Sequence, residues 1–223
     1  MKFEKRLALT GYLRKMFGVS DIHDKSSIRS YYKRFNEDAT GAAYDASGIS
    51  KVCNVLRSID RVSVPEEKLL EYDSNIRSHL EKINKHRQPK DQIVFKYFQF
   101  LAGFYTEYYL DRVTEDKQSL LEDLNSFVAE QKKNHRSKVS YEEFKESDLN
   151  KLAYWMATGS GKTLILHLNY YQFQHYLPRL DEAPDNILLI TPNAGLTHQH
   201  QKELNASGIP NRYYLDADGA AGI

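Results

Sequence analysis

The feature that most constrains this chain is a glycine-bearing turn between two apolar patterns of different period. Residues 152–156 are apolar and aromatic without polar alternation, which predicts a short buried strand. The turn spans Thr158–Gly161, and from Lys162 onward apolar residues recur at spacings of three and four, which predicts a helix. Strand, glycine turn and a helix that opens with Lys-Thr form the context that a phosphate-binding loop requires. The sequence therefore predicts such a loop in the last third of the chain.

Each residue type in this loop has a chemical reason in a site for ATP and Mg²⁺. Glycine lets consecutive backbone N–H groups turn toward one anion, because no Cβ stands in the way. The helix that begins at Lys162 adds the positive end of its dipole. We expect the Lys162 ammonium to reach the β- and γ-phosphates and the Thr163 hydroxyl to bind Mg²⁺. The predicted cofactor-binding residues of the loop are Thr158, Gly159, Ser160, Gly161, Lys162 and Thr163, with Thr163 also the metal ligand.

One position departs from the strict pattern G-x-x-x-x-G-K-[ST], which places its first glycine where this chain has Met156. The alternative interpretation is a chance Gly-Ser-Gly turn between a strand and a helix. Residues 156–163 resemble motif I of superfamily 2 helicases of the restriction-enzyme type, with a DEAD/DEAH-box core, in which the loop pattern is looser. About thirty residues later, Ile187–Asn193 followed by Gly195–His200 is similar to motif Ia of the same group.

The resemblance implies the N-terminal part of an ATP-dependent helicase or translocase, as in type III or type I restriction subunits. Its partner would be nucleic acid, DNA rather than RNA, in DNA restriction or phage defence. In that group the loop after the second strand contacts the nucleic-acid backbone, which makes Thr191 and Asn193 candidate contacts. Lys96–Gln99 is similar to an aromatic-x-Gln element whose glutamine bonds the adenine edge, so Gln99 is a further ATP-binding candidate. A surface or helix-internal glutamine is the alternative.

The predicted fold class is α/β. Three strands at 152–156, 187–191 and 212–215, joined by crossover helices, would begin a RecA-like P-loop parallel sheet. A mainly α-helical region at 1–90 precedes it, and the basic run at 84–90 marks the expected boundary to a partial RecA-like ATP-binding domain at 91–223. The chain has no Asp-Glu box, so we expect no complete catalytic set, no hydrolysis by this portion alone, and a missing C-terminal helicase domain or partner subunit.

Periodicity and capping residues predict helices through the rest of the chain. One long helix begins at Pro65 and carries an apolar stripe, which either packs within the N-terminal helices or docks another subunit. The basic run at 131–138 is either a solvated charge run or a phosphate contact. Helices are expected at Phe3–Phe17, from Asp24 or Ser26 to about Phe35, at about 49–60, from Pro65 to about Ile83, at Ile93–Thr114, at 116–134, from Lys162 to before Pro178, and at 194–205.

Composition sets the remaining limits. The 223 residues carry a net charge of +1, so any contact with nucleic acid must come from a local patch. Cys53 is the only cysteine, which excludes an internal disulfide. The sequence has no apolar run of about 18 residues, so we expect a cytoplasmic protein with no membrane partner. Two alternatives to the helicase stay open, a P-loop ATPase that moves no nucleic acid and a non-enzymatic interaction module.

Overall fold

The computed structural model describes residues 7–19, 33–35, 44–134, 141–180 and 184–213. The chain forms two compact units. The first unit comprises Met1–Ser74 and Phe95–Trp155, and the second comprises Asn75–Val94 and Met156–Ile223. Helix α4 (Glu66–Asn84) contributes its first part to one unit and the remainder to the other. The expected division at residue 90 stays a prediction.

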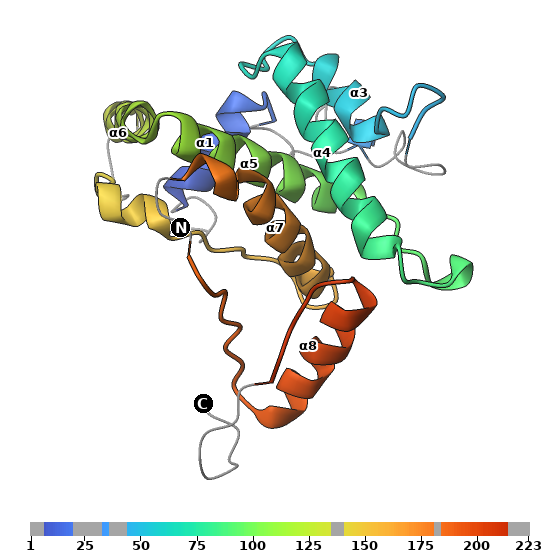
Figure 1. Ribbon diagram of the computed structural model, residues 1–223. Coiled ribbons are helices and arrows are strands. Elements are labelled where there is room, and N and C mark those ends of the chain that lie inside the picture. Colours follow the sequence, from blue (N-terminus) through green and yellow to red (C-terminus); the bar gives the residue numbers. More distant parts are fainter. Residues whose placement is uncertain (1–6, 20–32, 36–43, 135–140, 181–183, 214–223) are drawn as a thin grey trace. The chain divides into compact units, whose positions relative to one another are not determined.

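The predicted parallel sheet is wrong, because the described residues contain no β-strand. Their one isolated bridge joins Tyr44 and Ser50 in antiparallel fashion. The segments 152–156 and 187–191 are irregular, as are 212 and 213, while 214 and 215 lie outside the described residues (Figure 1). Strands of a parallel sheet are buried on both faces. Here the apolar side chains are exposed instead, with 78% of Trp155, 81% of Leu188 and 78% of Ile190 accessible to solvent.

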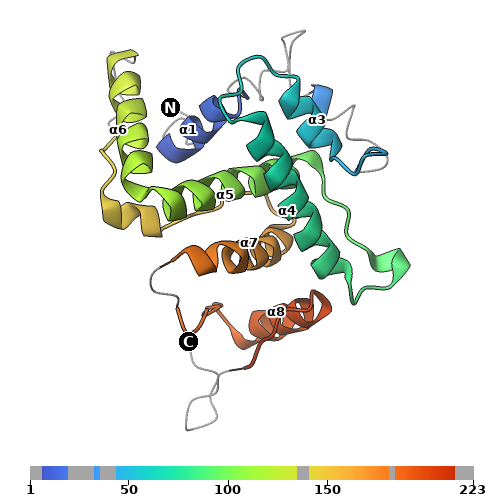
Figure 2. The same ribbon diagram turned by 45° about the horizontal axis from the view of Figure 1, so that its top comes forward.

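The first unit is organised around helix α5 (Tyr97–Glu115), which is buried on every side. Phe100 and Phe104 are buried on it together with the polar residues Glu107 and Asp111. A helix buried all round is a core element, so a single apolar stripe describes it poorly. The further elements of the unit are α1 (Ala8–Met16), α3 (Lys51–Arg57), the first part of α4, α6 (Lys117–Asn134) and the 3₁₀ helix η3 (Glu146–Asn150). Figure 2 shows α5 continuing at one end into α6, with α1 beside it.

Local signals set several helix ends. The Ser50 side chain accepts a hydrogen bond from the Cys53 N–H at 3.0 Å and caps α3. Pro65 precedes α4, and Glu66 and Glu67 occupy its first turn, where the helix dipole favours acids. After the C-cap Phe17 of α1, Gly18 adopts the left-handed conformation at φ 65°, which ends the helix. The next residue, Val19, is buried. The predicted helices at these places are confirmed, whereas residues 24–32 of the expected second helix lie outside the described residues.

The apolar stripe predicted on α4 is confirmed, since all of its members are buried in this chain. This burial favours packing over the docking of another subunit. The stripe consists of Leu69, Tyr72, Ile76, Leu80 and Ile83.

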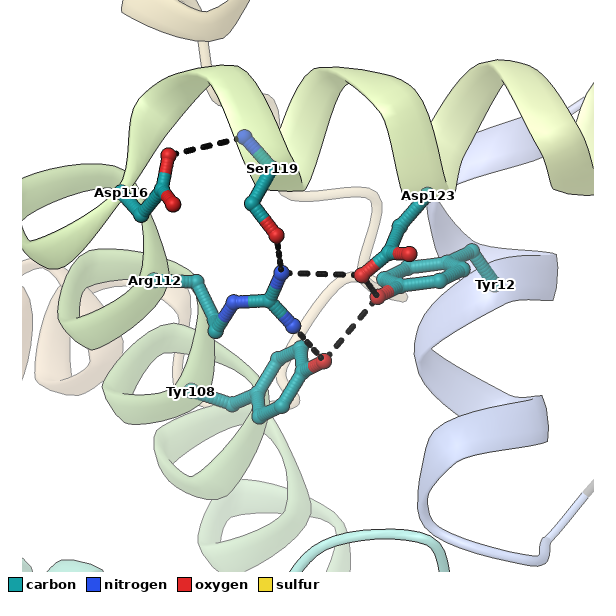
Figure 3. A network of polar contacts seen from close by, with 6 residues as sticks. All are labelled: Tyr12, Tyr108, Arg112, Asp116, Ser119 and Asp123. Carbon is teal, nitrogen blue, oxygen red and sulfur yellow. Dashed lines mark hydrogen bonds and ion pairs between the residues drawn. The ribbon is translucent and has the colours of Figure 1, made fainter.

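A polar network ties three helices of the first unit together (Figure 3). Arg112 on α5 donates to Tyr108 at 3.1 Å, to Ser119 at 3.0 Å and to Asp123 on α6 at 2.8 Å. Tyr12 of α1 lies 3.0 Å from the Tyr108 hydroxyl and donates to Asp123 at 3.4 Å. Burial, and then the bond to Tyr108, raises the pKa of Tyr12 well above its usual value, so its hydroxyl stays protonated. The network therefore fixes α1, α5 and α6 through satisfied polar groups.

The second unit contains the latter part of α4, the 3₁₀ helix η2 (Pro89–Asp91), α7 (Lys162–Tyr176), the 3₁₀ helix η4 (Leu177–Arg179) and α8 (Ala194–Ala206). The helices predicted from Lys162 and at 194–205 are thus confirmed. On α7 the apolar side chains Ile165 and Leu168 are buried, as expected of a core-facing stripe. No helix within the described ranges combines the length and apolar character needed to cross a bilayer.

Candidate phosphate-binding site

The loop at 157–161 is wound by two glycines in the left-handed region. Gly159 has φ 75° and Gly161 has φ 86°, values that L side chains rarely adopt. The Ala157 carbonyl accepts hydrogen bonds from the Ser160 N–H at 3.2 Å and from the Ser160 hydroxyl at 2.7 Å. A Cβ built on Gly159 would meet no atom within 4 Å, so the loop is open to solvent on that side. The turn is therefore held by hydrogen bonds among its own residues, and its open side is accessible from solvent.

Helix α7 begins directly from this loop. Gly161 is its N-cap, and the Gly161 carbonyl accepts the first helical bond from the Ile165 N–H at 3.1 Å. No side chain caps the helix, and its first turn contains no acidic residue. The N–H groups of the first turn have no partner within the helix itself, and they carry the positive end of its dipole. This end of α7 is electrostatically suited to an anion.

The Lys162 side chain folds back over the loop. Its ammonium donates to the Met156 carbonyl at 3.3 Å and to the Ala157 carbonyl at 3.1 Å, and the residue is exposed. An exposed lysine ordinarily extends its charge into water. Here the two hydrogen bonds hold the ammonium on the loop instead, next to the N-terminus of α7. Two donor types, ammonium and backbone N–H, thus converge at one exposed place.

The donor set fits a nucleotide phosphate better than a free metal ion. Thr163, half-buried in the first turn of α7, offers one hydroxyl oxygen. Within the described part of the chain, no group of three or more His, Cys, Asp or Glu side chains could hold a metal ion. Mg²⁺ keeps several waters and is commonly held by few protein ligands together with substrate phosphates. Thr163 could therefore hold Mg²⁺ only alongside phosphate oxygens and water.

Gln99 lies in the first unit, whereas the loop belongs to the second unit. It is buried at the start of α5, where its side-chain oxygen accepts a hydrogen bond from the Lys96 N–H at 2.8 Å. This bond is half of a capping box, so part of the amide serves its own helix. Gln99 as an adenine-binding residue stays a prediction.

Thr191 and Asn193 lie together at the N-terminus of α8. The Asn193 side chain accepts a hydrogen bond from the Leu196 N–H at 2.9 Å and caps the helix. The Thr191 hydroxyl donates to the Asn193 carbonyl at 3.3 Å and also bonds the Thr197 hydroxyl. Asn193 is exposed, and Thr191 is half-buried. Their proximity at a helix N-terminus is compatible with a backbone phosphate, and their role as nucleic-acid contacts stays a prediction.

One buried serine, Ser207, was missed by sequence reasoning. It follows the last residue of α8, and its hydroxyl bonds the His167 ring at 2.8 Å and accepts from Arg87 at 3.0 Å. Arg87 also pairs with Glu203 at 3.7 Å, and only 13% of its side chain is exposed. From its sequence the basic run at 84–90 is either a solvated linker or a phosphate contact. Arg87 departs from the solvated linker, because most of its side chain is buried. The available signal was Gly208, a glycine directly after a helix.

Comparisons with protein families, with curated proteins and with solved structures gave no match. The resemblance to superfamily 2 helicases therefore rests on the two sequence motifs alone.

Proposed function

We propose that residues 158–163 bind the phosphates of ATP with Mg²⁺, and that this chain is the ATP-binding portion of an ATP-dependent nucleic-acid helicase or translocase. The setting proposed from the motifs is DNA restriction or phage defence. The observation that carries the proposal is the loop itself. Two left-handed glycines lead into an uncapped helix N-terminus, and the Lys162 ammonium lies across that loop.

The geometry supports a binding step in which the Lys162 ammonium exchanges its hydrogen-bond acceptors. The Lys162 ammonium is held by two neutral carbonyl oxygens of its own loop. Phosphate oxygens are charged acceptors, and hydrogen bonds between ionised groups are roughly twice as strong as neutral ones. A triphosphate at the start of α7 would therefore draw the ammonium from the carbonyls onto the β- and γ-phosphates.

The test is calorimetry of MgATP binding to the whole chain and to its Lys162→Ala variant. We expect binding to be at least tenfold weaker in the variant, because the Lys162 ammonium, which lies on the loop, is gone. Lys202→Ala removes an exposed lysine from α8 and serves as the matched control, with unchanged affinity. Far-UV circular dichroism would establish that all three proteins fold alike. Equal affinity in folded Lys162→Ala would refute the phosphate-loop assignment.

Binding of single-stranded DNA tests the nucleic-acid part of the proposal separately. Contacts with backbone phosphates release counterions, so the logarithm of the affinity should fall linearly with the logarithm of salt concentration. Thr191→Ala combined with Asn193→Ala should weaken binding, whereas the Lys202→Ala control reports the contribution of a generic surface charge. A chain that binds MgATP but shows no salt-dependent DNA binding would favour a P-loop ATPase that moves no nucleic acid.

A further inference from the structure

Asn84, the last residue of α4, closes an exposed basic loop in the second unit. Its side-chain amide donates to the Ile93 carbonyl at 2.9 Å, and its side-chain oxygen accepts a hydrogen bond from the Ile93 N–H at 2.7 Å. We call the residues between these two, 85–92, the Asn84 loop. Its two ends are held together by one side chain, so it is a closed loop of the second unit rather than an extended linker.

Further hydrogen bonds fix the inside of the Asn84 loop. The Arg87 N–H donates to the Asn84 carbonyl at 3.0 Å, and the 3₁₀ helix η2 forms the middle of the loop. The Arg87 side chain turns inward, where it donates to the Ile83 carbonyl at 3.3 Å and to the Ser207 hydroxyl at 3.0 Å. Arg87 therefore anchors the loop, and the loop has a defined shape before any partner binds.

The charged side chains that the Asn84 loop presents to solvent are mainly cationic. Lys85 and Lys90 are exposed, and neither forms an ion pair with any residue that the structure describes. Asp91 is the acidic residue of the loop, and the exposed Lys82, three residues before Lys85, offsets its charge. The Lys82 ammonium lies 5.5 Å from the centroid of the Tyr171 ring. The surface around the loop is therefore positive and complementary to a polyanion.

Neither nearby carboxylates nor the helix dipole account for Lys90. Glu81 is paired with Arg77 at 4.0 Å, and Glu203 is paired with Arg87 at 3.7 Å. Cations are favoured in the last turn of a helix, which explains Lys82 in the last turn of α4. That effect falls off within one turn, and Lys90 follows the end of α4 by six residues.

We propose that the Asn84 loop binds the sugar–phosphate backbone of a single-stranded nucleic acid through Lys85 and Lys90, with the exposed amides of Gln88 and Gln92 as neutral donors. The inference rests on the proposed function and adds a contact surface outside the two sequence motifs. Lysine and glutamine side chains commonly bond phosphate oxygens, and such contacts carry no base-sequence information. A loop that is already ordered also loses less conformational freedom on binding. Recognition here is therefore of backbone charge.

The test is the salt dependence with which the whole chain binds a single-stranded oligo(dT). Each phosphate contact to a single strand contributes about 0.7 to the slope of log affinity against log salt concentration. Lys85→Ala combined with Lys90→Ala should make the slope less steep by about 1.4, so that binding at 0.1 M salt is about 25-fold weaker than in the wild type if the affinities agree at 1 M. An oligonucleotide of mixed sequence should give the same change.

Two further variants separate the charge of the loop from its order. Lys145→Ala combined with Lys151→Ala removes two exposed lysines on either side of η3, in the first unit, and should keep the wild-type slope. Asn84→Ala keeps every charge but removes both bonds to Ile93. It should weaken binding by at least about twofold at every salt concentration and leave the slope unchanged, because the loop must then be ordered on binding.

The outcomes distinguish this inference from the proposed function. A wild-type slope in the folded Lys85→Ala, Lys90→Ala protein would overturn the inference and leave the proposed function standing. Polyglutamate that competes as well as oligo(dT) of equal charge would also overturn it, and would identify a surface for an acidic protein. A wild-type chain that binds no oligonucleotide would overturn the inference together with the nucleic-acid part of the proposed function. Unchanged MgATP affinity in Lys162→Ala would refute the phosphate-loop assignment alone.

Discussion

Acid should destabilise the second unit through two buried histidines, His79 and His167. Both are almost inaccessible to solvent. Burial, followed by the nearby Lys82 and His175, lowers the pKa of His79 to about 3. For His167 burial is again the main cause, partly opposed by Glu203 and reinforced by Arg87, and it lowers the pKa to about 4. Each imidazole is therefore neutral in the folded protein and takes up a proton near its ordinary pKa when unfolded.

The direction and size of the effect follow from proton linkage. Below the ordinary pKa of 6.5 the unfolded state binds more protons than the folded state, so stability falls as the pH falls. The loss runs from about pH 6.5 down to the folded pKa of each residue, about 4 for His167 and about 3 for His79. Between pH 7 and pH 5, each histidine should cost about 2 kcal/mol, and the pair about 4 kcal/mol. That is a large part of the 5–15 kcal/mol that typically holds a domain folded.

The assay is hydrogen exchange of the α7 and α8 amides at pH 7 and pH 5, corrected for intrinsic exchange rates. It reports the local free energy of opening without assuming that the two units unfold together. His79→Phe keeps the ring that stacks on Tyr171, and His167→Asn keeps a hydrogen-bonding atom toward Ser207. Between pH 7 and pH 5, the free energy of opening should fall by about 2 kcal/mol less in each single variant than in the wild type. In the double variant it should fall by about 4 kcal/mol less. The exposed His198→Gln should behave as wild type.

The result that would refute this reasoning is a double variant that loses as much protection as wild type between pH 7 and pH 5. Carboxylates contribute to acid destabilisation in every variant, so the difference between proteins is the measured quantity. A variant's lower stability at pH 7 alone would have no bearing on the argument.

Three further predictions test the first unit and the exposed segments. Gly18→Ala forces a side chain into φ 65° with its Cβ 2.8 Å from the Ile59 Cγ2, and should cost about 2 kcal/mol of unfolding free energy in urea; an unchanged midpoint would contradict it. Burial raises the pKa of the Cys53 thiol to about 12, so a thiol reagent should label it only after unfolding, and rapid labelling of the native chain would show the burial to be wrong. Leu188→Lys with Ile190→Lys should leave helix content unchanged and reduce self-association by light scattering, because both side chains are exposed; a loss of helix would show that they pack.

The helices were predictable because their signals are local. The start of α4 follows from Pro65 and the acids after it, and the start of α7 follows from the glycines before Lys162. For the helix that became α5, apolar spacing predicts one core-facing side formed by Phe98, Leu101, Tyr105, Tyr108 and Tyr109. Phe100 and Phe104 lie outside that side and are buried too, so the all-round burial of α5 was not predictable from a stripe. The Ser207 hydroxyl bonds His167 and Arg87, which are 40 and 120 positions away, and no short-range pattern encodes contacts at that separation.

The strands failed for a related reason. A run of apolar residues makes a strand favourable, but a strand forms only where its backbone hydrogen-bonds to another strand elsewhere in the chain. Residues 187–190 have the composition of a buried strand, yet every one of their side chains is exposed. Apolar character alone predicted a strand for these residues, and that prediction is wrong. It could not say whether the described residues supply strands to pair with them.

The loop at 157–161, the proposed phosphate-binding loop, forms although the strand predicted before it is absent from the described residues. Its contacts explain this, because the Ala157 carbonyl binds Ser160 and Lys162, at most five positions away. The left-handed glycines and the helix start are equally local. A site held by contacts of such short range does not require a sheet in order to present its donors. MgATP binding by this chain, lost in Lys162→Ala, would therefore measure the loop itself and stand independently of the overturned fold class.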